Sequence, residues 1–342
     1  MKKQLLGMTL TELGELCSQL GLPRFASKQI ADWLYKKKVT EIEQMTNLSK
    51  SSREKLEEVC DFGRTTYSHL ISSIDGTKKY AFPTENGLEV EAVMIPDDGR
   101  ATLCVSCQAG CKMGCIFCMT GRQGFHGNLS TAEIISQFIS IDEADQLTNA
   151  VFMGMGEPLD NWSNVKKAIE VLTSDWGFGW SPKRITLSSI GVLGNLKDFL
   201  ENSKCNLAIS LHNPFPEERL AMMPVQQRYD IREVIDLIKQ YDFSGQRRVS
   251  FEYTMFAGLN DNKRHADALT RLLRGLPCRV NLIRFHQIPD SDLRTCSDEI
   301  MIFFEQRLIK AGITTTIRAS RGEDILAACG MLAGKTKKLS EI

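Results

Sequence analysis

Five of the chain's eleven cysteines fall within the fifteen-residue segment CVSCQAGCKMGCIFC, where they could hold a metal. One possibility is a zinc site, in which Cys104-x2-Cys107 and Cys115-x2-Cys118 form two CxxC pairs. Only seven residues separate these pairs, and Cys111 is left unused. The first pair also begins inside an apolar strand, where a zinc knuckle would be cramped. Zinc is therefore the less favoured of two interpretations.

The second possibility is an iron–sulfur cluster on a loop that directly follows that strand. Cys111-x3-Cys115-x2-Cys118 forms one unit that supplies three thiolates. A [4Fe–4S] cluster takes four ligands, so one iron would stay open to chelate a small molecule and pass an electron to it. The spacing favours this cluster, and the residues alone leave zinc open.

The whole chain indicates a cytoplasmic protein rather than a secreted or membrane protein. It begins MKKQLLGMTLTELGEL, but Glu12 and Glu15 interrupt the apolar run that follows the two lysines, and no small-residue cleavage site comes after it. No apolar stretch reaches the roughly 18 residues of a membrane span. In such a chain, cysteines are more often metal-bound or catalytic than disulfide-bonded.

The elements that must position the loop alternate between buried strands and amphipathic helices. Strands are expected in ATLCVSCQ, NAVFMGMG, RITLSSIG, CNLAISLH, RVSFEYTMF and RVNLIRFH, and helices near 131–142, 163–174, 194–202, 231–241, 264–274 and 298–310. These six units predict an α/β fold, a full or partial (β/α)6 barrel, with a doubly wound sheet as the alternative. In either fold the site lies beyond the carboxyl ends of the strands.

The first hundred residues have a different pattern. Residues 1–60 look helical, because Thr9-x-x-Glu12 is a capping box, Gly21 ends the helix that it opens, and Ser51-x-x-Glu54 opens another. A second stretch looks β-rich, with an Asp-Gly hairpin turn at 75–76. We expect a helical N-terminal accessory domain (1–60), a β-rich connecting segment (61–98), the barrel with a C-terminal cysteine segment (99–334) and a basic tail (335–342).

The formal net charge is zero, which argues against a strongly basic nucleic-acid binder but leaves room for a local basic patch. The candidate cations are Lys36, Lys37, Lys38, Arg247, Arg248, Arg318, Arg321, Lys335, Lys337 and Lys338. RNA binding is the function that these residues support least directly.

Six segments resemble, in the same order, blocks of the radical S-adenosylmethionine (radical SAM) adenine C2 methyltransferases of 23S rRNA and tRNA. They are CVSCQAGCKMGCIFCMTGRQGF, VFMGMGEPLDN, RITLSSIGV, LAISLHNPFPEERLAMMPV, VNLIRFHQIPDSD and RGEDILAACGMLAG. Phe117 completes the CxxxCx[aromatic]C form seen in radical SAM enzymes. The resemblance implies a partial (β/α)6 radical SAM barrel, a [4Fe–4S] cluster and SAM as cofactors, and methylation of adenine C2 in both kinds of RNA.

The resemblance also implies roles for individual residues. Cluster ligation falls to Cys111, Cys115 and Cys118, and SAM contact to Gly156, Glu157, Ser188, Ser210, Leu211, His212 and His286. Cys329 would receive a methyl group, Cys104 would resolve the resulting protein–RNA adduct by forming a disulfide with it, and Glu91 would take the C2 proton. Two positions depart from the family pattern: Cys107 stands where serine is more common, and His286 where asparagine is common.

The resemblance further implies a low-potential electron donor, flavodoxin-like or ferredoxin-like, and a monomer with no membrane partner. Two other functions stay open on the residues. One is the same chemistry at adenine C8, and the other is a zinc-dependent RNA-binding module without catalysis.

Overall fold

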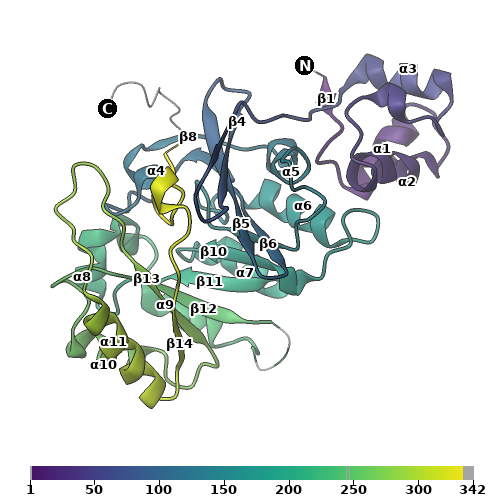
Figure 1. The fold of residues 1–342 in the computed structure, drawn as a ribbon. Coiled ribbons are helices and arrows are strands. Elements are labelled where there is room, and N and C mark those ends of the chain that lie inside the picture. The colour runs from purple at the N-terminus through teal and green to yellow at the C-terminus, as the bar shows by residue number, and fades with distance from the viewer. Residues whose placement is uncertain (1, 244, 246, 334–342) are drawn as a thin grey trace.

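The computed structural model describes residues 2–243, 245 and 247–333, and one ten-stranded sheet dominates it (Figure 1). The strands lie in the order β14-β13-β12-β11-β10-β9-β6-β5-β4-β3. Their bounds are β3 His69–Ser72, β4 Lys78–Pro83, β5 Glu89–Asp97, β6 Arg100–Cys104, β9 Asn149–Phe152, β10 Ile185–Ser189, β11 Asn206–Ser210, β12 Val249–Met255, β13 Arg279–Arg284 and β14 Thr314–Ile317.

From β6 to β14 every neighbouring pair is parallel, and the strands follow chain order without reversal. A doubly wound sheet would reverse its order at a switch point, so the partial barrel is confirmed and the alternative is not. The sheet contains a seventh parallel strand, β14, that the sequence analysis did not include. Its sequence TTTI is short and half polar, so it lacks the apolar run of the other strands.

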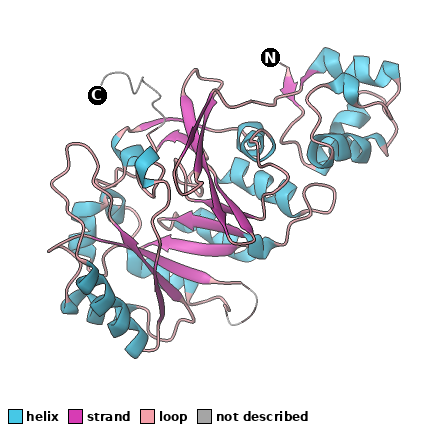
Figure 2. Ribbon diagram, viewed as in Figure 1, coloured by secondary structure: helices cyan, strands magenta, loops and turns pink. Residues whose placement is uncertain are grey.

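The expected helices form the outer layer of the barrel (Figure 2). They are α5 Thr131–Ile139, α6 Trp162–Thr173, α7 Leu193–Asn202, α9 Ile231–Ile238, α10 Lys263–Leu272 and α11 Asp298–Lys310. Shorter elements follow the carboxyl ends of the strands: β7 Gln108–Gly110, α4 Met119–Arg122, β8 Phe125–Asn128, α8 Pro216–Met222, η4 Pro224–Gln227 and η5 Glu323–Ile325. A further short element, η3 Pro182–Arg184, directly precedes β10. No helix within the described ranges is both long and apolar enough to cross a membrane.

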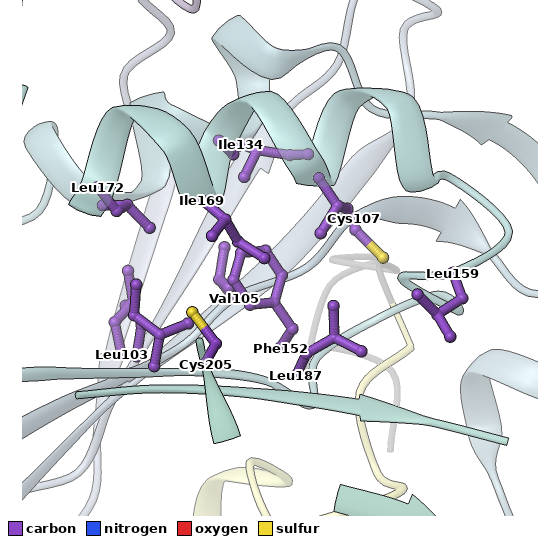
Figure 3. Packing of buried hydrophobic residues seen from close by; sticks show 14 of the residues in the cluster. Leu103, Val105, Cys107, Ile134, Phe152, Leu159, Ile169, Leu172, Leu187 and Cys205 are labelled. Carbon is purple, nitrogen blue, oxygen red and sulfur yellow. The ribbon is translucent and has the colours of Figure 1, made fainter. Parts of the chain in front are cut away.

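The core lies between the sheet and these helices, and β6 shows how side chains divide between its two faces. Leu103, Val105 and Cys107 point into the core, where they lie among Ile134 and Ile169 of the helices (Figure 3). Because successive side chains in a strand point to opposite faces, Cys104 between them points the other way. The Cys107 side chain is therefore part of the hydrophobic core.

The three antiparallel strands β3, β4 and β5 extend the same sheet beyond β6. The predicted Asp75-Gly76 turn joins β3 to β4, and Gly76 has a φ of +83°, which a side chain would strain. The segment predicted to be β-rich thus continues the barrel sheet.

The N-terminal unit is helical, as expected. Its elements are β1 Lys3–Gln4, α1 Leu10–Gln19, α2 Ala26–Ala31, η1 Asp32–Lys36, η2 Ile42–Gln44, α3 Lys50–Val59 and β2 Cys60–Asp61. The Thr9–Glu12 capping box is present, and Gly21 follows the end of α1 with a φ of +64°. The predicted Ser51 cap was wrong: Ser49 is the N-cap of α3 and accepts the backbone N–H of Ser52.

Figure 1 shows α1–α3 gathered at one end of the molecule, next to α5 and α6. Arg64 joins this unit to the barrel. Its guanidinium donates to the carbonyl of Lys38 (2.8 Å) and, at the carboxyl end of α5, to the carbonyl of Ile139 (2.6 Å) and the hydroxyl of Ser140 (3.0 Å). The last carbonyls of a helix have no partner within it, so these bonds satisfy groups that would otherwise be left open.

Arg64→Ala should therefore destabilise the protein by about 2 kcal/mol, because hydrogen bonds to a charged donor are stronger than neutral ones. The measurement is urea unfolding, with Arg274→Ala in the exposed turn that follows α10 as the control, which should change little. Equal stability of both variants would show that Arg64 does not join the two parts.

Candidate active site

A cavity of about 430 Å³ opens at the carboxyl ends of the parallel strands. Side chains from most strands and from the segment that follows β14 line it, because parallel strands end at the same edge of the sheet. Of the residues predicted from the sequence, Cys104, Cys111, Cys115, Cys118, Gly156, Glu157, Ser188, Ser210, His212, His286 and Cys329 line it. Glu91 and Leu211 do not.

Cys111, Cys115 and Cys118 lie on the loop between β7 and α4 and face the cavity together. Burial raises the pKa of the Cys111 thiol to about 12 and that of Cys115 well above its ordinary value, and charge on Cys118 raises both further. Without a metal these thiols stay protonated.

This donor set fits a [4Fe–4S] cluster. Thiolates ligate the irons of such a cluster, and metal binding deprotonates a coordinating thiol. Among the residues that the structure describes, no group of three or more His, Cys, Asp or Glu side chains is arranged around one metal ion. A cluster does not need that arrangement, since each cysteine binds a different iron. The loop leads into α4, where a Cβ on Gly121 would lie only 3.0 Å from the backbone nitrogen of Cys115.

Glu157 is buried in the wall of the cavity just after β9. Its carboxylate accepts the backbone N–H groups of Leu159 and Ile190 at 3.0 Å and a hydrogen bond from Ser189. Burial nevertheless raises its pKa to about 7, since desolvation outweighs these hydrogen bonds. Gly156 before it has a φ of +99°, and a Cβ there would lie 2.5 Å from the Gln108 side chain.

Ser188 is the penultimate residue of β10 and Ser210 is the last residue of β11, and both face the cavity. His212 follows in the left-handed region, with a φ of 56°. Its Nδ1 accepts the backbone N–H of Thr254 at 2.9 Å, and its ring lies edge-on to Phe117. Burial, aided by the charge of Arg219, lowers its pKa to about 3, so the ring is neutral with the proton on Nε2.

Leu211 lies between Ser210 and His212 in the chain, and it is fully buried. Its N–H donates to the Glu252 carbonyl at 3.0 Å. His286 lines the opposite side of the cavity, where Nε2 lies 2.9 Å from the Ser320 hydroxyl and Nδ1 lies 3.1 Å from a Glu323 oxygen.

Cys104 and Cys329 face the same cavity from different parts of the chain, β6 and the C-terminal segment. Burial raises the pKa of Cys104 to about 12, whereas Cys329 is exposed. Charge on Cys329 raises the Cys104 pKa further, so the two thiols interact, and all eleven cysteines are free. Two hydrogen bonds hold the segment on α4: Met119 N–H donates to the Gly330 carbonyl (2.8 Å), and the Thr120 hydroxyl to that of Leu332 (2.7 Å).

Glu91 is buried on β5 and lies outside the cavity lining. It forms an ion pair with Lys79 at 3.0 Å, and its other oxygen accepts the backbone N–H of Ala333 at 2.9 Å. The C-terminal segment that carries Cys329 therefore contacts Glu91 directly.

The cavity also contains a charged pair that sequence reasoning did not assign to the site. Glu252 of β12 is buried in the wall, and Arg318, just after β14, lies 3.4 Å from it. Arg318 also lowers the pKa of Cys104, against the larger effect of burial. A glutamate in the apolar strand RVSFEYTMF was the signal that could have identified this pair.

Several of the cationic side chains proposed to contact RNA make contacts within the protein instead. Lys38 pairs with Asp145, Lys37 lies over the Trp33 ring at 3.4 Å, and Arg247 donates to three backbone carbonyls. Arg321 is 3.6 Å from Asp97 at the cavity. The lysines of the tail lie outside the described residues.

Comparison with known proteins shows the same two parts. Residues 105–269 match the radical SAM superfamily, and residues 3–62 match the ribosomal RNA large subunit methyltransferase N-terminal domain. Members of the radical SAM superfamily use a [4Fe–4S] cluster and SAM.

Relatives match over nearly the full chain. A probable dual-specificity RNA methyltransferase RlmN from Porphyromonas gingivalis is 57% identical over 98% of this chain and 98% of its own. The dual-specificity RNA methyltransferase RlmN of Syntrophus aciditrophicus is 40% identical over 96% of this chain and 95% of its own. The crystal structure of a radical SAM methyltransferase from Sphaerobacter thermophilus, 37% identical, superposes with a TM-score of 0.91 and covers 97% of this chain and 100% of its own. The chain therefore belongs to the RlmN family of radical SAM RNA methyltransferases.

Proposed function

We propose that the chain methylates C2 of adenine in 23S rRNA and in a subset of tRNAs, through an S-methylcysteine on Cys329. One observation carries the proposal: a single cavity holds the three cysteines of the cluster loop together with Cys104 and Cys329. The relatives named as dual-specificity RNA methyltransferases support RNA as the substrate class.

The chemistry explains why so many thiols are needed. Adenine C2 lies between two ring nitrogens and is electron-poor, so it does not attack the electrophilic methyl group of SAM. The cluster, when bound, supplies the electron that starts radical cleavage of SAM. Cys329 in its thiolate form is a competent nucleophile and takes a methyl group from a SAM molecule by displacement.

Cys104 and Glu91 would complete the reaction after the Cys329 methylene has bonded to C2. Glu91 would accept the C2 proton. The unpaired electron left by the addition would pass back toward the cluster site. The Cys104 thiolate would attack the Cys329 sulfur, so that a disulfide forms and the bond from this sulfur to the carbon breaks. The electron pair of that bond would stay on the carbon, which takes up a proton and becomes the methyl group. In the structure Glu91 contacts Ala333 and Lys79, so it must leave the Ala333 N–H before it reaches a substrate in the cavity.

The remaining predicted residues would bind SAM. We assign this role to Gly156, Glu157, Ser188, Ser210, Leu211, His212 and His286, which surround the cavity or support its wall. Neutral His212 can donate from Nε2, because Nδ1 already accepts a hydrogen bond.

An adenine inside folded RNA must leave its stack to reach this cavity. We propose that residues 1–60, docked on α5 through Arg64, act as an accessory domain for RNA recognition. The proposal also includes a monomer in the cytoplasm and a low-potential electron donor of the flavodoxin or ferredoxin kind.

Identification of the methylated nucleoside tests the proposed function. Purified protein incubated with SAM, a reductant and RNA should give 2-methyladenosine in both 23S rRNA and tRNA, as read by nucleoside mass spectrometry. Cys329→Ala is the control and should give none. A product that matches 8-methyladenosine would overturn C2 as the target, and unmodified tRNA beside modified rRNA would overturn the dual specificity.

The Cys104→Ala and Cys329→Ala variants should stop the reaction at different steps. Cys329→Ala removes the methyl acceptor, so RNA and protein should both stay unmethylated. Cys104→Ala leaves the acceptor and the cluster loop intact but removes the thiol that releases the product. This variant should accumulate bound to RNA through Cys329, seen on a denaturing gel as a band that ribonuclease shifts.

Cys107 should not rescue this variant, because its side chain lies in the core on the other face of the sheet. Cys104→Ala/Cys107→Ala is the control and should show the same adduct. A single band that ribonuclease does not shift, in Cys104→Ala, would refute the resolving role. The same band together with an adduct in the double variant would show that Cys107 is a second resolving thiol.

A further inference from the structure

Arg219 in α8 is a buried cation to which the proposed chemistry gives no role. It is 0% exposed, which is exceptional for a side chain that carries a permanent charge. Its guanidinium donates to the carbonyls of Ser210 (2.9 Å) and Leu211 (3.0 Å) and to the side-chain oxygen of Gln226 (2.5 Å). All three acceptors are neutral.

No carboxylate of the described residues lies within ion-pairing distance of this guanidinium. Hydrogen bonds to neutral oxygens reduce the cost of burial but do not neutralise the charge, and a buried charge without a counter-ion is strongly unfavourable. The charge of Asp230 acts on Arg219 from beyond that distance, so the guanidinium has no carboxylate in direct contact. Its surroundings therefore suit a further negative group.

The nearest candidate for this group lies on the cluster loop. The carboxyl end of α8 contacts the loop directly, since the Ile116 N–H donates to the Met222 carbonyl at 3.1 Å. Pro224, which begins η4, approaches the position of a Cβ on Gly114 to 3.8 Å. Met222 is the last residue of α8, the helix that also carries Arg219, so the guanidinium belongs to the element that packs on the cluster loop.

We propose that Arg219 is the internal counter-charge of the thiolate-bound cluster and raises its reduction potential. This inference rests on the proposed function, because it requires the cluster on Cys111, Cys115 and Cys118. Three thiolates around a [4Fe–4S] core of charge 2+ give a net charge of −1, and one electron from a low-potential donor brings it to −2. A fixed positive charge in a low-dielectric site stabilises the more negative state more strongly.

Arg219 is a positioning and electrostatic residue in this account, not a group that touches the reacting atoms. A purely structural role is the alternative, because the same guanidinium also holds the turn from Ser210 to His212. Lysine keeps the charge but loses the planar fork of donors, whereas glutamine keeps a neutral donor and loses the charge. The two substitutions therefore separate charge from structure.

The test is an anaerobic redox titration of the cluster, followed by electron paramagnetic resonance, in purified wild-type, Arg219→Lys and Arg219→Gln protein with dithionite as the reductant. Arg219→Gln should lower the equilibrium constant for reduction at least tenfold, a shift of about 59 mV for one electron. Arg219→Lys should stay close to the wild type.

The matched control is Arg247→Gln. Arg247 is also a part-buried guanidinium that donates to three backbone carbonyls, of Cys205, Leu200 and Phe199, but it lies beside the start of β11, away from the cavity. Its loss should lower the melting temperature and leave the potential unchanged. A shift in this control equal to that of Arg219→Gln would overturn the proposal.

Each remaining outcome also decides the question. An unchanged potential in Arg219→Gln would overturn the counter-charge, and so would equal loss of iron in Arg219→Gln and Arg219→Lys, since lysine keeps the charge. Loss of iron in Arg219→Gln with retention in Arg219→Lys would support it. If the wild type holds no cluster, the proposed function fails, which is distinct from failure of the role of Arg219.

Discussion

The structure depends on the requirement that seven parallel strands end at one edge of the sheet while side chains alternate between its two faces. On β6 and the residue that follows it, this alternation sends Leu103 and Val105 into the core and Cys104 into the cavity. A shift of one residue in its register would exchange the two sets, burying Cys104 under the helices and exposing apolar side chains to the cavity. The positions of the three-cysteine loop and of Cys104 are set together by this single strand.

The same geometry concentrates ionisable groups where water is scarce. Burial raises the pKa of Glu157 to about 7 and of Cys111 to about 12, and it leaves Arg219 charged among neutral acceptors. Burial of each of these groups lowers the stability of the folded protein when no cofactor is bound. Bound cofactors would offset the cost, since thiolates bind iron and the positive charge gains a negative neighbour. Cofactor binding should therefore contribute to the stability of the folded chain as well as to its chemistry.

Much of this could be predicted from the sequence, because its signals are local. The strand and helix periodicity placed six units correctly, and the spacing of Cys111, Cys115 and Cys118 identified a loop whose three cysteines line one cavity. The N-cap of α3 was assigned wrongly because several serines precede that helix and only the backbone geometry selects Ser49. β14 was missed because TTTI is too short and too polar for the pattern that revealed the other strands.

Other features depend on contacts between distant parts of the chain and leave no local signal. The pair of Glu252 and Arg318 forms only because β12 and the end of β14 meet at the cavity. The contact of Glu91 with Ala333 joins two segments 242 residues apart. The isolation of Arg219 from carboxylates is likewise visible only when its surroundings in space are known. The roles of individual residues in SAM binding and catalysis remain predictions, which the geometry supports by bringing most of them to one cavity.

The central claim is that the three thiols of one loop hold a [4Fe–4S] cluster in the cavity that also contains Cys104 and Cys329. Iron and sulfide analysis of anaerobically purified protein tests it most directly. Wild-type protein and Cys107→Ala should hold about four iron atoms per chain, and Cys111→Ala/Cys115→Ala/Cys118→Ala should hold almost none. Iron retained by the triple variant, or a single zinc ion in the wild type, would contradict the account.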